Sequence, residues 1–195
     1  MKSLLLGLAL LVASNVAAAQ TSTPLAAPAA VAAPAPPPAP FKLGDVAPDF
    51  ALPYATRDSV ADDDLMLSSL VGKSTIVLAF YPADWSGGCT REVCALRDNF
   101  GALGALHAEV IAISGDYVFS HFEWAKFHRL PFRLASDHNH AVAKQYGSYN
   151  EQRGFNRRTV FAIDRAGKVA YFDMAYSVRD SASFGKLQDA LKRMN

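Results

Sequence analysis

The two cysteines of the 195-residue chain, Cys89 and Cys94, are the residues whose type and spacing could support redox chemistry. A cysteine thiolate is a nucleophile, and its oxidation to a sulfenic acid or a disulfide is reversible. Cys89 follows Gly87 and Gly88 at the predicted first turn of a helix. Unpaired backbone N–H groups and the positive end of the helix dipole favour a thiolate at such a position, so Cys89 is the predicted nucleophile.

The four residues between Cys89 and Cys94 limit what the pair can form. In an intact helix their Cα atoms would lie roughly 8 to 9 Å apart, whereas a disulfide normally requires less than about 7 Å. A permanent structural disulfide and two inert buried cysteines are the alternatives to a catalytic pair, and the Cys-x-x-Cys motif of thiol exchangers and zinc sites is absent. The spacing suits a cycle in which Cys89 is oxidised and Cys94 attacks it after local unfolding.

The elements that must position these cysteines alternate between strands and helices. Near-continuous apolar runs at residues 74–81 and 109–116 predict buried parallel strands, and residues 89–106 predict the crossover helix of a βαβ unit. The alternation continues with predicted helices at 118–130, 140–147 and 181–195, a strand at 132–137, and two strands within 158–175 around a turn at 164–167. This order predicts an α/β fold with a central mixed sheet.

The first forty residues are typical of targeting and spacer segments. Residues 1–19, with an apolar run at 4–12 and small residues at the end, have the pattern of a secretory signal peptide. That run is shorter than the roughly 20 residues needed to cross a bilayer, so an uncleaved anchor is the less favoured alternative. Residues 20–40 are mostly Ala and Pro and predict a disordered linker. We expect a single domain at 41–195 that is exported, with the periplasm as the expected compartment.

The charge of the chain argues against some partner classes. The net charge is +1, and no basic cluster provides an electrostatic footprint for nucleic acid or for an anionic membrane. We therefore expect no nucleic-acid partner and no stable membrane insertion after cleavage. A small neutral substrate is compatible with this charge.

The histidines offer a possible metal site that the sequence does not support. His121 and His128 lie two turns apart on the predicted helix, and His138 and His140 are close together. No tight ligand set with accompanying carboxylates or thiolates emerges, so we predict surface histidines and no metal.

The segment around the cysteines contains Phe80-Tyr81-Pro82-Ala83-Asp84, Ser86, Cys89, Glu92, Cys94 and Arg97-Asp98. In this order the residues resemble the active-site segment of peroxiredoxins, the AhpC/TSA family. The C-x4-C arrangement resembles the subgroup called bacterioferritin comigratory protein or peroxiredoxin Q. The stretches GDVAPDFAL and RTVFAIDRAGKVAYF resemble the opening strand region of the family and its arginine-bearing strand and hairpin.

The resemblance implies a thioredoxin-like fold and a thiol-dependent peroxidase that reduces hydrogen peroxide or organic hydroperoxides. In that family pattern Cys89 is the peroxidatic nucleophile, Cys94 is the resolving cysteine, and Arg158 holds the thiolate and the substrate oxygens. Pro82 is implied to shield the pocket, and the hydroxyl of Ser86 to hydrogen-bond the peroxide. No cofactor is implied, and an external dithiol such as a thioredoxin-like protein would reduce the disulfide.

Some residues depart from the family pattern or leave it ambiguous. Ser86 replaces the usual Thr, which keeps the hydroxyl but loses the methyl that restricts its rotamer. Trp85 is bulky beside the cysteine segment, which puts the rate and the substrate range in question. Arg157 is adjacent to Arg158, and successive strand residues face opposite sides. The register favours Arg158, with Arg157 solvated. Glu92 either orients an arginine or simply stabilises the start of the helix.

Two other functions are considered. A thiol–disulfide exchange protein on the same fold is disfavoured by the absence of Cys-x-x-Cys. A scaffold or adhesion module, tethered by the Ala/Pro linker, would use the two cysteines as a permanent disulfide.

Overall fold

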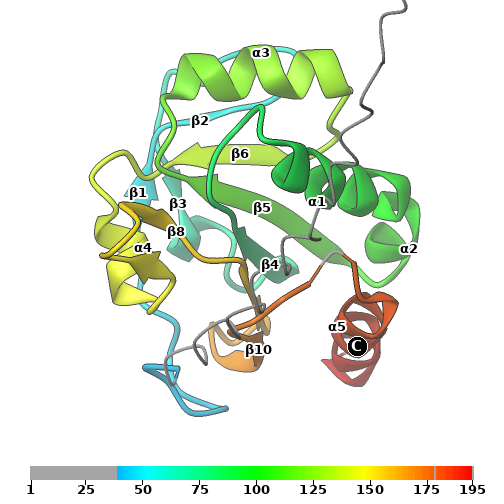
Figure 1. The fold of residues 1–195 in the computed structure, drawn as a ribbon. Helices are drawn as coiled ribbons and strands as arrows, with labels where there is room; N and C mark the ends of the chain where they lie inside the picture. Colours follow the sequence, from blue (N-terminus) through cyan, green and yellow to red (C-terminus); the bar gives the residue numbers. More distant parts are fainter. Residues whose placement is uncertain (1–38, 178, 195) are drawn as a thin grey trace, which may run out of the picture. The chain divides into compact units, whose positions relative to one another are not determined.

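The computed structural model describes residues 39–177 and 179–194 of the chain (Figure 1). The predicted signal peptide, 1–19, and the predicted linker up to residue 38 lie outside the described residues. Ala39, near the end of that linker, is half-buried and packs against an apolar core of the domain. In the described part of the chain, no helix has the length and apolar character needed to span a membrane.

A mixed sheet with the strand order β10-β9-β4-β5-β6-β2 runs through the described domain (Figure 1). Its strands are β2 (Tyr54–Ala55), β4 (Thr75–Phe80), β5 (Ala108–Ser114), β6 (Arg133–Ser136), β9 (Thr159–Ile163) and β10 (Val169–Asp173). β4 is parallel to β5 and β5 to β6, while β9 pairs antiparallel with β4, β10 with β9, and β2 with β6. Every residue of β4 is buried, which explains its nearly uninterrupted apolar sequence.

Helices lie against both faces of this sheet. They are α1 (Gly87–Asp98), α2 (Phe100–Ala105), α3 (Val118–His128), α4 (Ala141–Gln145) and α5 (Ser181–Met194). α1, α2, α3 and α5 share one core with Val77 and Ala79 of β4, and α4 contributes to the core on the other face with Ile76 and Leu78. The predicted α/β class, with a central mixed sheet flanked by helices, is confirmed.

Several short elements have no counterpart among the predicted ones. They are β2, β3 (Leu65–Met66), β7 (Tyr149–Asn150) paired with β8 (Phe155–Asn156), and the 3-10 helix η1 (Leu67–Ser69). β3 pairs with β1 (Ala51–Leu52), which lies within the stretch GDVAPDFAL that resembles the opening strand region of the family. A two-residue strand is too short to show a hydrophobic period, so the sequence pattern carries no signal for it.

The crossover between β4 and β5 differs from the single helix predicted at 89–106. Asn99 divides it into α1 and α2, because the backbone of Asn99 leaves helical geometry at φ −102° and ψ 6°. Nδ2 of Asn99 donates a hydrogen bond to the carbonyl oxygen of Ala95 at 2.8 Å, and such a side-chain bond competes with the helical pattern. α3 also ends earlier than predicted, since Arg129 adopts the left-handed region at φ 54°.

The topology brings two distant segments together at the carboxyl end of β4. α1 follows β4 after the loop at residues 81–86. β9 is the antiparallel neighbour of β4, and its first residue, Thr159, pairs with Phe80 at the end of β4. Arg158, immediately before β9, therefore lies at the same edge of the sheet as the first turn of α1.

Candidate active site

Cys89 lies in the first turn of α1, as predicted. Ser86 is the N-cap of that helix: its backbone is extended, and its Oγ accepts a hydrogen bond from the backbone N–H of Cys89 at 3.4 Å. The Ser86 hydroxyl also donates to the carbonyl oxygen of Ala83 at 3.2 Å. The Cys89 side chain is fully buried, and both Cys89 and Cys94 are free thiols rather than a disulfide.

Arg158 supplies the charged partner of Cys89. Its Nη2 donates a hydrogen bond to Sγ of Cys89 at 3.2 Å. An ideal Cβ at Gly88 would lie 2.7 Å from the same Nη2, so a side chain there would displace the guanidinium. The absence of a side chain at Gly88 thus leaves the space that the Arg158 guanidinium occupies. Arg157 is half-buried rather than solvated as predicted, and its Nε is shielded from solvent without a hydrogen-bond partner among the described residues.

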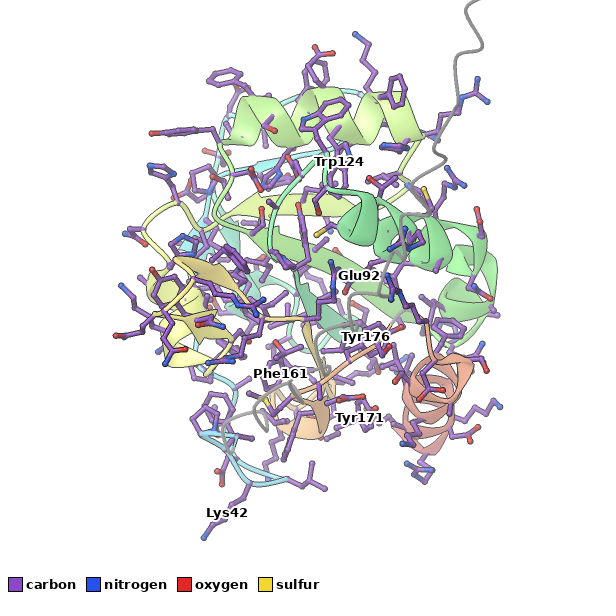
Figure 2. All side chains as sticks on the ribbon, in the orientation of Figure 1. Lys42, Glu92, Trp124, Phe161, Tyr171 and Tyr176 are labelled. Atoms are coloured by element: carbon purple, nitrogen blue, oxygen red, sulfur yellow. The ribbon has the colours of Figure 1, made fainter. Side chains whose placement is uncertain are left out.

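Glu92, one turn after Cys89, fixes the other side of the guanidinium. Its Oε2 accepts a hydrogen bond from Nη1 of Arg158, and the two side chains form an ion pair. Glu92 belongs to α1 (Figure 2), and its side chain is fully buried. Burial raises the pKa of Glu92 to about 7, although the positive charge of Arg158 lowers it. Of the two roles considered for Glu92, orienting an arginine is the one that these contacts support.

The charge of Arg158 is stabilised in turn by its two partners. Burial disfavours the charged guanidinium, but the negative charges of Glu92 and Cys89 raise the pKa of Arg158 above its ordinary value. The guanidinium is therefore a permanent cation at this site. Its fork presents separate N–H groups to the carboxylate and to the sulfur.

Cys94 faces a different part of the molecule. Five positions along an ideal helix turn the side chain by roughly 140° relative to Cys89. Cys94 is half-buried, and its Sγ lies 3.9 Å from Nδ1 of His128 on α3. A disulfide between Cys89 and Cys94 therefore requires the first turns of α1 to unwind.

A buried polar network fixes the loop that precedes α1. The carboxylate of Asp84 accepts hydrogen bonds from the Tyr81 hydroxyl at 2.7 Å and from the Ser120 hydroxyl at 2.8 Å. Nδ1 of His121 lies 2.9 Å from the same carboxylate, and Nε2 of His121 lies 3.2 Å from the carbonyl oxygen of Ala135. Both ring nitrogens of His121 thus lie within hydrogen-bond distance of an oxygen acceptor. The network ties the loop to α3 and β6.

The comparisons with known proteins identify the family. A model described as "AhpC/TSA family" matches residues 43–172. The chain belongs to the AhpC/TSA family. It is 40% identical over 129 residues to the chloroplastic peroxiredoxin Q of Triticum aestivum, covering 66% of this chain and 57% of that relative. It is 36% identical over 152 residues to the chloroplastic peroxiredoxin Q of Populus jackii, covering 76% and 67%.

A solved structure agrees with this assignment. The crystal structure of peroxidoxin BcpB from Mycobacterium tuberculosis matches with a TM-score of 0.67 and 31% identity, covering 80% of this chain and 99% of that one. The chain is therefore a peroxiredoxin of the bacterioferritin comigratory protein and peroxiredoxin Q subgroup, as its C-x4-C spacing predicted. It spans 57% of the length of its wheat relative.

The prediction of surface histidines is wrong for His121 in this peroxiredoxin. His121 is fully buried, and His128 and His140 are half-buried, whereas His138 is exposed. The reason for His121 is the buried Asp84 carboxylate, which needs a hydrogen-bond donor from α3. A signal was present in the sequence: His121, Trp124 and His128 share one helical face, and Trp124 is fully buried.

The remaining loop residues frame the site. Pro82 is half-buried in the loop between β4 and α1, and its shielding role stays a prediction. Trp85 is 54% exposed and adopts a left-handed backbone at φ 59°. Its indole Nε1 donates a hydrogen bond to the Ser120 hydroxyl at 3.3 Å. Trp85 therefore lies against α3, where its ring also contacts Phe127 and His128.

A small pocket with three arginines lies beside Gly88, the residue before Cys89. Its volume is about 250 Å³, and it is lined by Gly88, Arg91, Arg158, Tyr176, Ser177 and Arg179. Tyr176 lies near Glu92 (Figure 2); burial raises its pKa and the charge of Glu92 raises it further, so this phenol stays neutral. The pocket gives a small solute access to the Arg158 side of the site.

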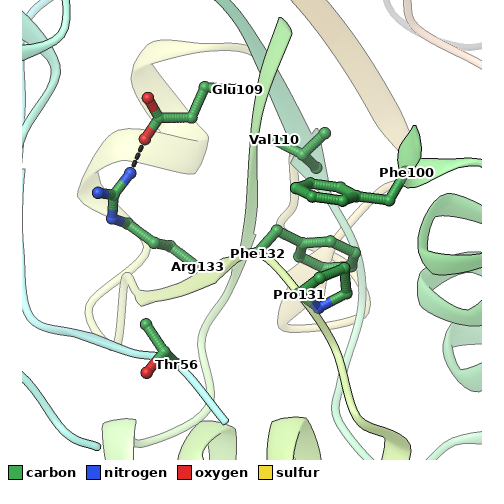
Figure 3. Close-up of a pocket in the computed structure, with 7 residues that line it drawn as sticks. All are labelled: Thr56, Phe100, Glu109, Val110, Pro131, Phe132 and Arg133. Atoms are coloured by element: carbon green, nitrogen blue, oxygen red, sulfur yellow. Dashed lines mark ion pairs between the residues drawn. The ribbon is translucent and has the colours of Figure 1, made fainter. Parts of the chain in front are cut away.

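A second pocket, of about 290 Å³, lies away from the cysteines (Figure 3). It is lined by Thr56, Phe100, Glu109, Val110, Pro131, Phe132 and Arg133, and holds a Glu109–Arg133 ion pair. Glu109 and Arg133 lie at the amino ends of β5 and β6, whereas Cys89 follows the carboxyl end of β4. This pocket contains no thiol. Within the described ranges, no group of three or more His, Cys, Asp or Glu side chains could hold a metal ion.

Proposed function

We propose that this peroxiredoxin is a thiol-dependent peroxidase that reduces hydrogen peroxide and organic hydroperoxides. The observation that carries the proposal is the 3.2 Å hydrogen bond from Arg158 to the buried sulfur of Cys89, at a helix N-terminus beside a small open pocket. A fixed cation and a helix N-terminus both stabilise negative charge on sulfur and on a departing oxygen.

The first step is attack of the Cys89 thiolate on one oxygen of the hydroperoxide. The S–O bond forms as the O–O bond breaks, and the second oxygen leaves as water or an alcohol after taking a proton. Arg158 stabilises the charge that moves onto this leaving oxygen. The Ser86 hydroxyl, beside the backbone N–H of Cys89, would hydrogen-bond the peroxide, and Pro82 would keep bulk water from the sulfur.

The second step converts the Cys89 sulfenic acid to a disulfide with Cys94. The Cys94 sulfur attacks the Cys89 sulfur, the Cys89 S–O bond breaks, and water is released. Cys94 points away from Cys89 in the intact helix, so local unwinding of α1 must precede this step. An external dithiol, of the kind a thioredoxin-like protein carries, would then reduce the disulfide by exchange.

The activity is tested by peroxide consumption with dithiothreitol as the electron donor. The unmodified chain and the Cys94→Ser variant, which the small dithiol can reduce directly, should both consume peroxide, and Cys89→Ser should not. Insulin-disulfide reduction provides the contrast with a thiol exchanger. Insulin reduction without peroxide consumption would contradict the proposal.

We further propose that the enzyme is exported to the periplasm through cleavage of residues 1–19, on the basis of the N-terminal sequence pattern. Expression of the full chain in a Gram-negative host should give a periplasmic product whose mass corresponds to a start at Gln20. A product retained in the cytosol with its first nineteen residues intact would contradict this localisation.

A further inference from the structure

His128, at the carboxyl end of α3, lies beside the second cysteine. Its Nδ1 is 3.9 Å from Sγ of Cys94, within the range of a hydrogen bond to sulfur. The bond joins α1 to α3 across 34 positions of sequence. His128 has no role in the peroxide-reducing step described above.

The imidazole of His128 is held in place by aromatic rings. Its ring centroid lies 4.9 Å from that of Phe127, 5.8 Å from that of Trp124, and 6.3 Å from that of Trp85. Trp124 is fully buried, and Trp85 belongs to the loop that leads to Cys89. The imidazole therefore packs against three aromatic rings, one of them buried, and its Nδ1 lies toward the sulfur.

The charges around His128 favour its neutral form. Burial lowers the pKa of His128, and the positive charge of Arg97 lowers it further. Among the described residues, the titratable or charged groups that face this ring are Cys94 and Arg97 of α1, and Arg97 is paired with Asp98 at 2.8 Å. Glu123 and Lys126 of its own helix, and Arg129 after it, are exposed to solvent. A neutral imidazole can accept a proton, whereas an imidazolium cannot.

A second contact keeps His128 and Cys94 together. Nη1 of Arg97 donates a hydrogen bond to the carbonyl oxygen of His128 at 2.8 Å, which ties the last turn of α1 to α3. If the first turns of α1 unwind, this bond still holds the later turns. Cys89 would then move toward Cys94, while Cys94 stays beside the imidazole.

We propose that His128 is the general base of the disulfide-forming step, an inference that rests on the peroxidase function proposed above. The imidazole Nδ1 takes the proton of the Cys94 thiol as the Cys94 sulfur attacks the Cys89 sulfenic acid. The S–S bond forms, the Cys89 S–O bond breaks, and the departing hydroxide takes the proton from the imidazolium, which gives one water. Peroxide has already supplied the oxidising equivalent, so the step needs no further oxidant.

The test separates the two chemical steps in the reduced full-length protein. Hydrogen peroxide is mixed with the protein, the reaction is quenched with acid after set times, and intact-mass spectrometry measures thiol, sulfenic acid and disulfide. The variants are His128→Gln, which keeps polarity, and His128→Phe, which keeps the ring packing. His138→Gln, at an exposed histidine, is the matched control. Thermal melting establishes that each variant is folded, and either His128 variant is sufficient for the test.

The expected result is specific to one step and to pH. Sulfenic acid should form at an unchanged rate in all variants, while disulfide formation at pH 6.5 should be at least about tenfold slower in the His128 variants, a modest loss for a general base. The difference should shrink by pH 9, where an unassisted thiol is mostly ionised. His138→Gln should match the unmodified protein.

Two results would overturn the inference about His128 alone. They are an unchanged rate of disulfide formation, and a slowing that is equal at all pH values, which indicates a structural role. Absence of both sulfenic acid and disulfide in the unmodified protein after peroxide is added is a distinct result: it would remove the peroxidase function and this inference with it.

Discussion

Cys89 and Cys94 lie on the same helix, yet they differ in exposure, in the charge of the nearest partner and in the element that supplies that partner. Cys89 is fully buried and receives a hydrogen bond from Arg158, which comes from the segment before β9. Cys94 is half-buried and faces His128 of α3. The partner of Cys89 is always charged, whereas the partner of Cys94 can gain and lose a proton.

The difference matches the demands of two different reactions. A thiol that must react with a small, weakly acidic peroxide benefits from a permanent charge that stabilises both the thiolate and the leaving oxygen. A thiol that reacts with a neighbouring sulfenic acid must lose its proton only when that acid has formed. One helix can therefore carry both functions, because its two faces contact different parts of the fold.

Removal of the permanent charge should produce the largest effect. Arg158→Met is expected to lower the second-order rate constant of Cys89 with hydrogen peroxide by about 100- to 1000-fold, the usual loss for one donor to a developing oxyanion. The matched control is Arg157→Met, at the adjacent position, which should change this rate constant by less than about threefold. Competition for hydrogen peroxide against a peroxidase of known rate constant measures this second-order rate constant. Equal losses in both variants would contradict the assignment of Arg158.

Ser86→Ala should produce the next largest effect, because Ser86 both caps α1 and presents its hydroxyl beside Cys89. Loss of the cap is expected to cost about 1 kcal/mol of unfolding free energy. Loss of one hydrogen bond to the peroxide is expected to lower the rate constant by about tenfold. Ser86→Thr is the matched control and should preserve both quantities. An Ala variant with unchanged stability and rate would show that the hydroxyl has neither role.

The Glu92–Arg158 pair gives a pH dependence of stability with a defined sign. The pKa of Glu92 is raised from 4.5 to about 7 in the folded protein, so between these values the folded state binds the proton more tightly than the unfolded state. The contribution of the Glu92 carboxyl to the free energy of unfolding is therefore fully present below pH 4.5. This contribution is lost as the pH rises through about 7.

Glu92→Gln sharpens this point because it removes the titrating group while it keeps the shape. Urea unfolding at several pH values should show that the unmodified protein loses stability relative to the variant from about pH 4.5 to pH 7, with a constant difference above that range. A difference that grows in the opposite direction, or that is constant throughout, would contradict the raised pKa.

Cys94→Ser should have the smallest effect on the fold. Cys94 is a free, half-buried thiol, so its replacement should change the unfolding free energy by less than about 1 kcal/mol under reducing conditions. A permanent disulfide in a scaffold protein predicts a larger loss under oxidising conditions. Urea unfolding with and without a reductant distinguishes these outcomes.

The sequence predicts the elements with strong local signals. The apolar runs that become β4 and β5 are strand-length and uninterrupted, and the turn that joins β9 and β10 carries its own glycine. The break at Asn99 is missed because an asparagine inside an amphipathic pattern becomes a helix boundary only when its side chain bonds the backbone.

The parts of the site that depend on tertiary contacts are harder to predict. Strand alternation and the family's register favour Arg158 over Arg157 as the active-site arginine, because successive residues of a strand face opposite sides of the sheet. The sequence alone predicts surface positions for His121 and His128, because the contacts that explain them, with Asp84 and Cys94, join segments more than thirty residues apart. Their helical spacing with the buried Trp124 is the signal that could have shown them to be inward-facing.

Stopped-flow fluorescence tests the central claim, that Cys89 and Cys94 carry two successive steps, most directly. The indole of Trp85 lies in the loop before Cys89 and beside His128, so it can report on both cysteines. The reduced protein should show a first phase whose rate is proportional to peroxide concentration and a second phase that is independent of it. Cys89→Ser should abolish both phases and Cys94→Ser only the second, whereas a reduced, folded protein without a peroxide-dependent phase would contradict the account.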